Sequence, residues 1–126
     1  RDWQRASPTM LMGKSWDTHG PMGPWMVTGD AFDPHNRQLT TRVNGEIRQD
    51  SSTDDLIFDC FDIVHHLSSA FTLDPGTVIA TGTPAGVGLY WDPPKMLKVG
   101  DEVSISIEGI GTLTNSFISE PDTQLI

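Results

Sequence analysis

Lys14 is the residue of this chain whose setting best suits chemistry. It lies in the stretch 11–24, which reads LMGKSWDTHGPMGP. Glycine and proline shape the backbone around it, so a ligand that binds there has little additional chain to order. An ammonium group on such a loop suits the oxygen of an anion. We therefore expect Lys14 to bind an anionic group, and the alternative is an ordinary surface lysine.

A second glycine-rich loop, residues 80–88, reads ATGTPAGVG and follows an apolar, strand-like run. Its Thr83 offers a hydroxyl between Gly82 and Pro84, although a threonine there also suits a plain turn. The two loops together predict one pocket to which Lys14 and Thr83 both contribute. The rest of the chain is then the scaffold between them.

Three familiar sequence motifs are only partly matched, because the residues at their required positions differ. Residues 13–15 read GKS, like the end of a phosphate-binding P-loop, but Pro8 stands where that motif needs its first glycine. Asp17 replaces the final glycine of a nucleophile elbow. Residues 81–88 lead into Tyr90 and two prolines instead of a helix, which argues against a dinucleotide site. The sequence also has no H-E-x-x-H motif and no pair of cysteines.

Composition limits the classes of partner. The 126 residues suffice for one domain or part of one, and the chain begins with Arg1, so we expect a processed or incomplete piece. A net charge of -9 argues against nucleic acid and against an anionic membrane surface. No apolar run approaches the roughly 20 residues that span a bilayer. Cys60 is the single cysteine, which excludes an internal disulfide and favours the reducing cytoplasm.

Two hairpins dominate the expected scaffold. Asn44-Gly45 separates strand-like runs at 39–43 and 46–49, and this dipeptide supplies the positive φ angles of a tight turn. Near the end of the chain, apolar residues alternate with polar ones over 103–107 and again over 113–117. Residues 25–28 and 77–81 read as further short strands.

One helix is expected over 54–70, where apolar residues recur at spacings of three and four after hydroxyl residues that can cap it. Asp55, Asp59 and Asp62 would share a face, which we interpret as solvated and not as a metal cluster. Cys60 would belong to the apolar stripe. The adjacent His65 and His66 would diverge too far to bind one ion, and we interpret them as structural. The chain is therefore mostly β (α+β), wrapped into a curved sheet or barrel.

The order of several segments resembles one enzyme family. They are RDWQ at 1–4, GKSWDT at 13–18, GPMGP at 20–24, VNGE at 43–46, LDPGTVIATGTPAGVG at 73–88 and VGD at 99–101. Together they are similar to the fumarylacetoacetate hydrolase (FAH) family over nearly the whole chain. The resemblance implies a mixed β-sandwich roll with one main helix, assembled as a homodimer.

The resemblance also implies chemistry on small dioxo or oxo-enol carboxylates with a divalent metal, commonly Mg²⁺ and alternatively Mn²⁺ or Ca²⁺. The leading hypothesis is a hydrolase that cleaves a C–C bond in an acylpyruvate-like acid. The alternatives are an isomerase or decarboxylase of hydroxymuconate-type or oxo acids in aromatic catabolism, and a non-catalytic binding protein on the same fold.

Individual site residues come from the resemblance as well. Lys14 is implied as the catalytic residue, Arg1, Gln4, Lys14 and Thr83 as substrate-binding residues, and Thr18 as a neighbour of the metal. The metal carboxylates of the family precede the segment that matches residues 1–4, so no metal ligand is expected in this chain. We therefore expect residues 1–126 to be the C-terminal portion of a single catalytic domain and to be inactive alone.

Overall fold

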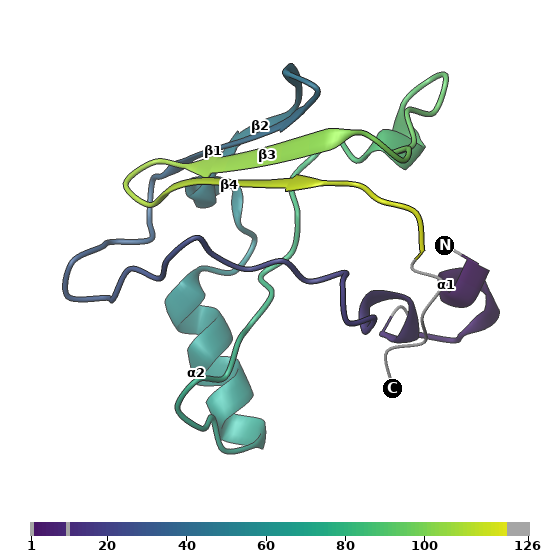
Figure 1. Cartoon of the computed structure of the whole chain (residues 1–126). Helices are drawn as coiled ribbons and strands as arrows, with labels where there is room; N and C mark the ends of the chain where they lie inside the picture. Colours follow the sequence, from purple (N-terminus) through teal and green to yellow (C-terminus); the bar gives the residue numbers. More distant parts are fainter. Residues whose placement is uncertain (1, 10, 121–126) are drawn as a thin grey trace.

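A four-stranded antiparallel sheet is the largest unit of the fold. The computed structural model describes residues 2–9 and 11–120. The strand order is β2-β1-β3-β4, and the strands are β1 Gln38–Val43, β2 Glu46–Ser52, β3 Glu102–Ile107 and β4 Gly111–Ser116. One main helix, α2 (Cys60–Ala70), projects from beneath the sheet (Figure 1). These elements confirm the mostly β, α+β class with one main helix. Within the described residues, no helix has the length and apolarity needed to cross a lipid bilayer.

The Asn44-Gly45 turn joins β1 to β2, as the sequence predicts, with φ angles of 50° and 81°. The turn also binds the start of β3. The Asn44 side-chain amide donates to the Asp101 carboxylate at 2.8 Å, and the Glu102 N–H donates to the Asn44 amide oxygen at 2.9 Å. The first hairpin is therefore fixed to the second by residues more than fifty positions apart.

The second hairpin, β3–β4, is also confirmed. Its turn is covered by the extended segment around Trp25, whose indole N–H donates to the Ile110 carbonyl at 2.5 Å. A side chain at Gly111 would meet the Trp25 ring, so the absence of Cβ there permits the contact. The sequence prediction of a strand over 25–28 is wrong, because Trp25 contacts the sheet through its indole and not through a backbone ladder.

The strand predicted over 77–81 is also not formed. A strand requires a neighbouring backbone to receive its hydrogen bonds. The sheet of the described chain pairs only the four strands named above, so the β-branched run stays extended and unpaired. Val78 in this run is largely exposed.

The helix begins later than its sequence pattern predicts. Instead of one helix over 54–70, the chain forms a short 3₁₀ turn, η2 (Thr53–Asp55), an extended break at Leu56, and then α2 from Cys60. Ser52 caps η2, and its side chain accepts from the Asp54 N–H at 3.2 Å. Asp59 caps α2 and accepts from the Asp62 N–H at 2.8 Å. Asp55 therefore lies in η2 and shares no helix face with Asp59.

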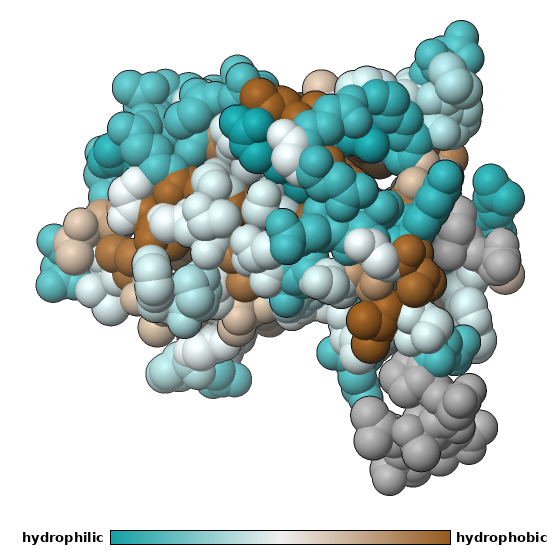
Figure 2. Space-filling model, turned by 45° about the horizontal axis from the view of Figure 1, so that its top comes forward, coloured by the Kyte–Doolittle hydropathy of each residue, from teal (hydrophilic) through white to brown (hydrophobic). Residues whose placement is uncertain are grey.

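An unusually large apolar surface is exposed to solvent. Among the described residues Val43 alone is buried, with 7 % of its surface exposed. The accessible surface is 10177 Å², whereas a compact monomer of this mass exposes about 6,600 Å². Figure 2 shows hydrophobic patches breaking a mostly polar surface. The hairpins are thus held mainly by backbone pairing and by side-chain hydrogen bonds at their turns.

We expect Asn44→Ala to lower the free energy of unfolding by about 1–3 kcal/mol, because it removes two hydrogen bonds between the hairpins. Asn36→Ala is the matched control, since Asn36 has nearly the same φ of 52° and takes no part in those bonds. Urea denaturation of both variants measures the difference. Equal losses would show that only the left-handed backbone matters.

The same contact predicts a dependence on pH. Hydrogen bonds from the Asn44 side chain and from the Lys98 backbone N–H lower the pKa of Asp101 below its ordinary 3.8. A carboxyl group whose pKa is lowered on folding stabilises the fold above the ordinary value, and that contribution is lost as the pH falls through the lowered value. We expect the melting temperature to fall below about pH 4. The fall should be shallower in Asn44→Ala than in the parent protein, measured by thermal melts across pH.

Candidate functional site

The first predicted loop forms a unit with the start of the chain. Helix α1 (Asp2–Ala6) lies against the 3₁₀ turn η1 (Met12–Lys14). Gly13 permits this approach, because a Cβ there would overlap the Gln4 side chain. Lys14 closes η1 with its N–H donating to the Leu11 carbonyl at 3.0 Å. The structure thus places Gln4 beside the loop of Lys14.

Aromatic contacts complete this unit. The rings of Trp3 and Trp16 meet edge to face at 5.7 Å, and the Trp16 ring lies 6.2 Å from that of His19. Thr18 is adjacent, with its hydroxyl 3.4 Å from the His19 Nδ1. Lys14 and Thr18 are exposed. Arg1 lies outside the described residues.

The second predicted loop forms the wall of a cavity of about 420 Å³. Its other walls come from β1, the end of β2, the η2 region and α2. The lining residues are Leu39, Ser51, Ser52, Thr53, Asp55, Leu56, Ile57, Phe58, Ile63, Thr81, Gly82, Thr83 and Pro84. Hydroxyl groups and one carboxylate line part of this space, and aliphatic and aromatic carbon lines the rest. Such a mixture suits a small ligand with polar and apolar portions.

The predicted residues of the first loop lie outside the cavity of the second loop. Neither Gln4 nor Lys14 nor Thr18 lines the cavity that Thr83 borders. A pocket shared by Lys14 and Thr83 therefore stays a prediction.

Gln49 is the residue at this cavity that sequence reasoning missed. Its side-chain amide donates to the Thr83 hydroxyl and to the Pro84 carbonyl, each at 2.9 Å. The loop is also held at Gly86, whose carbonyl accepts from the Trp91 indole at 3.1 Å. Gly86 has a φ of 105°, and a Cβ there would overlap the Arg48 carbonyl oxygen. The hairpin signal places 46–49 in a strand, but no sequence pattern shows which distant loop that strand contacts.

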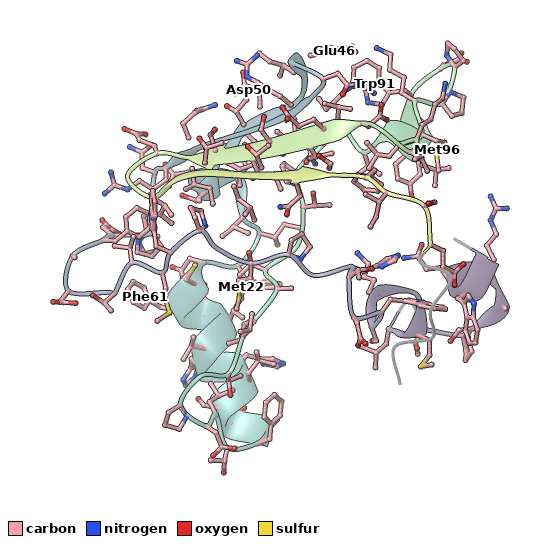
Figure 3. The ribbon with its side chains drawn as sticks, viewed as in Figure 1. Met22, Glu46, Asp50, Phe61, Trp91 and Met96 are labelled. Atoms are coloured by element: carbon pink, nitrogen blue, oxygen red, sulfur yellow. The ribbon has the colours of Figure 1, made fainter. Side chains whose placement is uncertain are left out.

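Charged residues hold the end of the sheet beside this loop. The Lys95 ammonium lies 2.5 Å from the Glu46 carboxylate and 4.2 Å from the centre of the Trp91 ring. The Arg48 guanidinium lies 5.3 Å from the same ring. Figure 3 shows Glu46 and Trp91 at one end of the sheet. The hydrogen bond from Lys95 lowers the pKa of Glu46 below its ordinary value.

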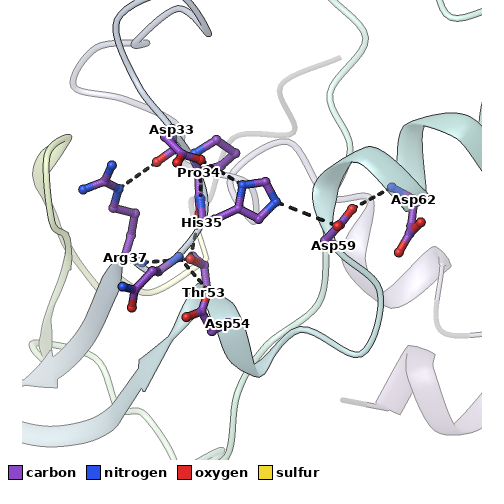
Figure 4. A network of polar contacts seen from close by, with 9 residues as sticks. Asp33, Pro34, His35, Arg37, Thr53, Asp54, Asp59 and Asp62 are labelled. Atoms are coloured by element: carbon purple, nitrogen blue, oxygen red, sulfur yellow. Dashed lines mark hydrogen bonds and ion pairs between the residues drawn. The ribbon is translucent and has the colours of Figure 1, made fainter.

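A polar network joins the segment before β1 to the start of α2 (Figure 4). The His35 ring lies 2.8 Å from the Asp33 carboxylate and 3.9 Å from that of Asp59, and it stacks near Phe61. Hydrogen bonds from His35 lower the pKa of Asp33. Within residues 2–9 and 11–120, no three His, Cys, Asp or Glu side chains are arranged to hold a metal ion.

Comparison with known proteins defines the class. Residues 1–118 match the sequence profile described as Fumarylacetoacetate (FAA) hydrolase C-terminal. A fumarylacetoacetate hydrolase structure from Exiguobacterium antarcticum is 48% identical with a TM-score of 0.91, over 95% of this chain and 43% of that one. The chain belongs to the fumarylacetoacetate hydrolase family.

More particular relatives include the mitochondrial oxaloacetate tautomerase Fahd2a of Rattus norvegicus, 46% identical over 94% of this chain and 38% of the relative. The oxaloacetate tautomerase YisK of Bacillus subtilis is 46% identical over 91% of this chain and 38% of its own length. A maleylpyruvate hydrolase from Sphingobium sp. SYK-6, in complex with manganese (II) ion and pyruvate, is 38% identical with a TM-score of 0.73. The match covers 82% of this chain and 37% of the hydrolase chain. The chain thus spans less than half the length of these relatives.

We expect Gly86→Ala to destabilise the fold more than Gly82→Ala, by about 1–3 kcal/mol, because the added methyl group meets the Arg48 carbonyl oxygen. Gly82 is the matched control. Its φ of 107° is nearly the same, but a Cβ there meets nothing within 4 Å. Chemical denaturation of the two variants supplies the comparison. Equal stability would mean that the loop moves away from β2 without loss.

Proposed function

We propose that the protein is an enzyme that interconverts the keto and enol forms of oxaloacetate or of a closely related oxo acid. The observation that supports this proposal is the 46% identity to oxaloacetate tautomerases from a mammal and from a bacterium, over more than nine-tenths of the chain. Hydrolysis, the leading hypothesis from the sequence, becomes the second candidate. The similarity to a maleylpyruvate hydrolase supports it.

The proposed roles follow from the charge that develops in the reaction. Keto–enol conversion removes a proton from the carbon beside the keto group and adds one at the keto oxygen, which carries negative charge during the change. The ammonium group of Lys14 offsets that charge. The Gln4 amide and the Thr83 hydroxyl bind substrate oxygens, and Arg1 pairs with a carboxylate. Thr18 stands near the metal in this scheme.

A divalent ion, Mg²⁺, Mn²⁺ or Ca²⁺, is part of the proposal for the complete protein. The manganese of the maleylpyruvate hydrolase structure supports it. The described residues supply no cluster of three ligands, so, apart from the position of Thr18, none of the roles above is assigned through the ion.

We also propose a domain assignment, an oligomeric state and a cellular compartment for the protein. Residues 1–126 form the C-terminal portion of one catalytic domain, which the 38% share of the relatives supports. The protein is a homodimer, and its large open apolar surface is consistent with further contacts. Its compartment is the cytoplasm, which the free Cys60 favours, although the rat relative is named as mitochondrial.

The test uses the protein as its gene encodes it, supplied with Mg²⁺ or Mn²⁺. Oxaloacetate in its enol form is added, and the loss of enol absorbance is followed while mass spectrometry examines the product. Tautomerisation changes no mass, decarboxylation loses CO₂, and hydrolysis of an acylpyruvate adds water. Acceleration of the absorbance change without a change of mass supports the proposal. Hydrolysis of acylpyruvates without tautomerase activity would favour the second candidate, and binding without turnover would favour a non-catalytic protein.

Lys14→Ala should lower kcat/KM by roughly 10²-fold, the effect of losing one preorganised group that stabilises charge. Lys98→Ala is the control, because Lys98 is also an exposed lysine and lies at the start of the turn before β3. Steady-state kinetics of both variants give the ratio, and circular dichroism checks the fold. Unchanged turnover in Lys14→Ala would make Lys14 a surface residue.

A further inference from the structure

We propose that Gln49 is a positioning residue that holds Thr83 against the substrate and directs the Thr83 hydroxyl proton toward a substrate oxygen. This inference rests on the proposed function, because it concerns the same oxo-acid site. Gln49 lies on β2, whereas Thr83 borders the cavity from a loop more than thirty residues further along the chain. The two hydrogen bonds of the Gln49 amide connect these elements.

The orientation of the Gln49 amide follows from its partners. The Pro84 carbonyl oxygen can only accept a hydrogen bond, so the amide nitrogen must face it. The second N–H of the same nitrogen then points to the Thr83 hydroxyl at 2.9 Å, and that hydroxyl is the acceptor. A hydroxyl that accepts keeps its own proton to donate. Thr83 is therefore prepared to donate to a carboxylate or keto oxygen, which are the polar groups of an oxo acid.

An irregularity of the hairpin brings Gln49 to this loop. Thr41 is opposite Gln49 and Arg42 is opposite Ile47, so Arg48 is an additional residue in β2. In a regular strand, successive side chains point to opposite faces. A bulge relaxes this rule and redirects a side chain. Arg48 and Gln49 accordingly both engage the segment 83–91, Arg48 over the Trp91 ring and Gln49 at Thr83.

The loop itself offers few backbone bonds that could replace Gln49. Residues 77–84 belong to no strand or helix. Gly82, with a φ of 107°, adds freedom before Thr83, and Pro84 has no N–H to donate. The Trp91 indole holds the loop only further along, at the Gly86 carbonyl. The position of the Thr83 hydroxyl therefore depends on the Gln49 side chain.

The first test measures the loop without any substrate. Backbone ¹⁵N relaxation is compared for the protein as its gene encodes it and for Gln49→Glu, which keeps the size of the side chain but cannot donate to the Pro84 carbonyl. We expect the order parameters of residues 81–83 and 85–88 to fall toward the values below about 0.6 that mark a flexible backbone. Gln38→Leu is the control, since Gln38 lies in β1 and bonds to Asp50 and not to the loop. Unchanged order parameters in Gln49→Glu overturn the positioning role whatever the activity.

The second test measures binding and turnover. Gln49→Glu and Thr83→Ala should each raise the KM for the oxo acid about fivefold, the effect of losing one hydrogen bond, and change kcat by less than about twofold. The double variant should be no worse than either single variant, because both changes remove the same contact. Multiplied effects in the double variant, or a wild-type KM in Gln49→Glu, overturn the inference. A loosened loop in a protein without tautomerase or hydrolase activity supports the positioning role and overturns the proposed function.

Discussion

The fold depends on backbone pairing of β1 along both of its edges. This strand binds β2 on one side and β3 on the other, with Val43 opposite both Glu46 and Val103. Because so little apolar surface is buried, the ladders and the turn residues that fix their register carry most of the order. The loop of Thr83 has no ladder of its own and takes its position from β2. The shape of the cavity beside that loop therefore depends on the register of the strands.

Local signals predicted the hairpins well and the remaining elements less well. Asn44-Gly45 and the alternation over 103–107 specify turns and faces within a few residues, so the sequence suffices there. The predicted start of the helix was wrong because the sequence offers two capping positions. Ser52, one of the hydroxyl residues before Asp54, caps only the short turn η2, and Asp59 caps α2. The runs 25–28 and 77–81 have strand composition, but pairing needs a partner that composition cannot reveal.

The residues of the candidate site were likewise only partly indicated by the sequence. The likeness of short segments pointed to Gln4 and Lys14, and the structure brings their backbone segments together through Gly13. It could not reveal Gln49, because a glutamine in a strand carries no sign of a distant loop. The contact depends on a glycine at position 86 and on an extra residue in β2, and neither has meaning until the fold is known.

The additional residue in β2 has an evolutionary consequence. A change of chain length inside a strand is ordinarily harmful, because a shift of one position moves side chains to the opposite face. Arg48 is an exception, since its removal would leave Thr41 opposite Gln49 and Arg42 opposite Ile47. Homologues of unequal hairpin length can therefore differ at this point and still share the remaining register. Such a homologue would lack the contact of Arg48 with Trp91.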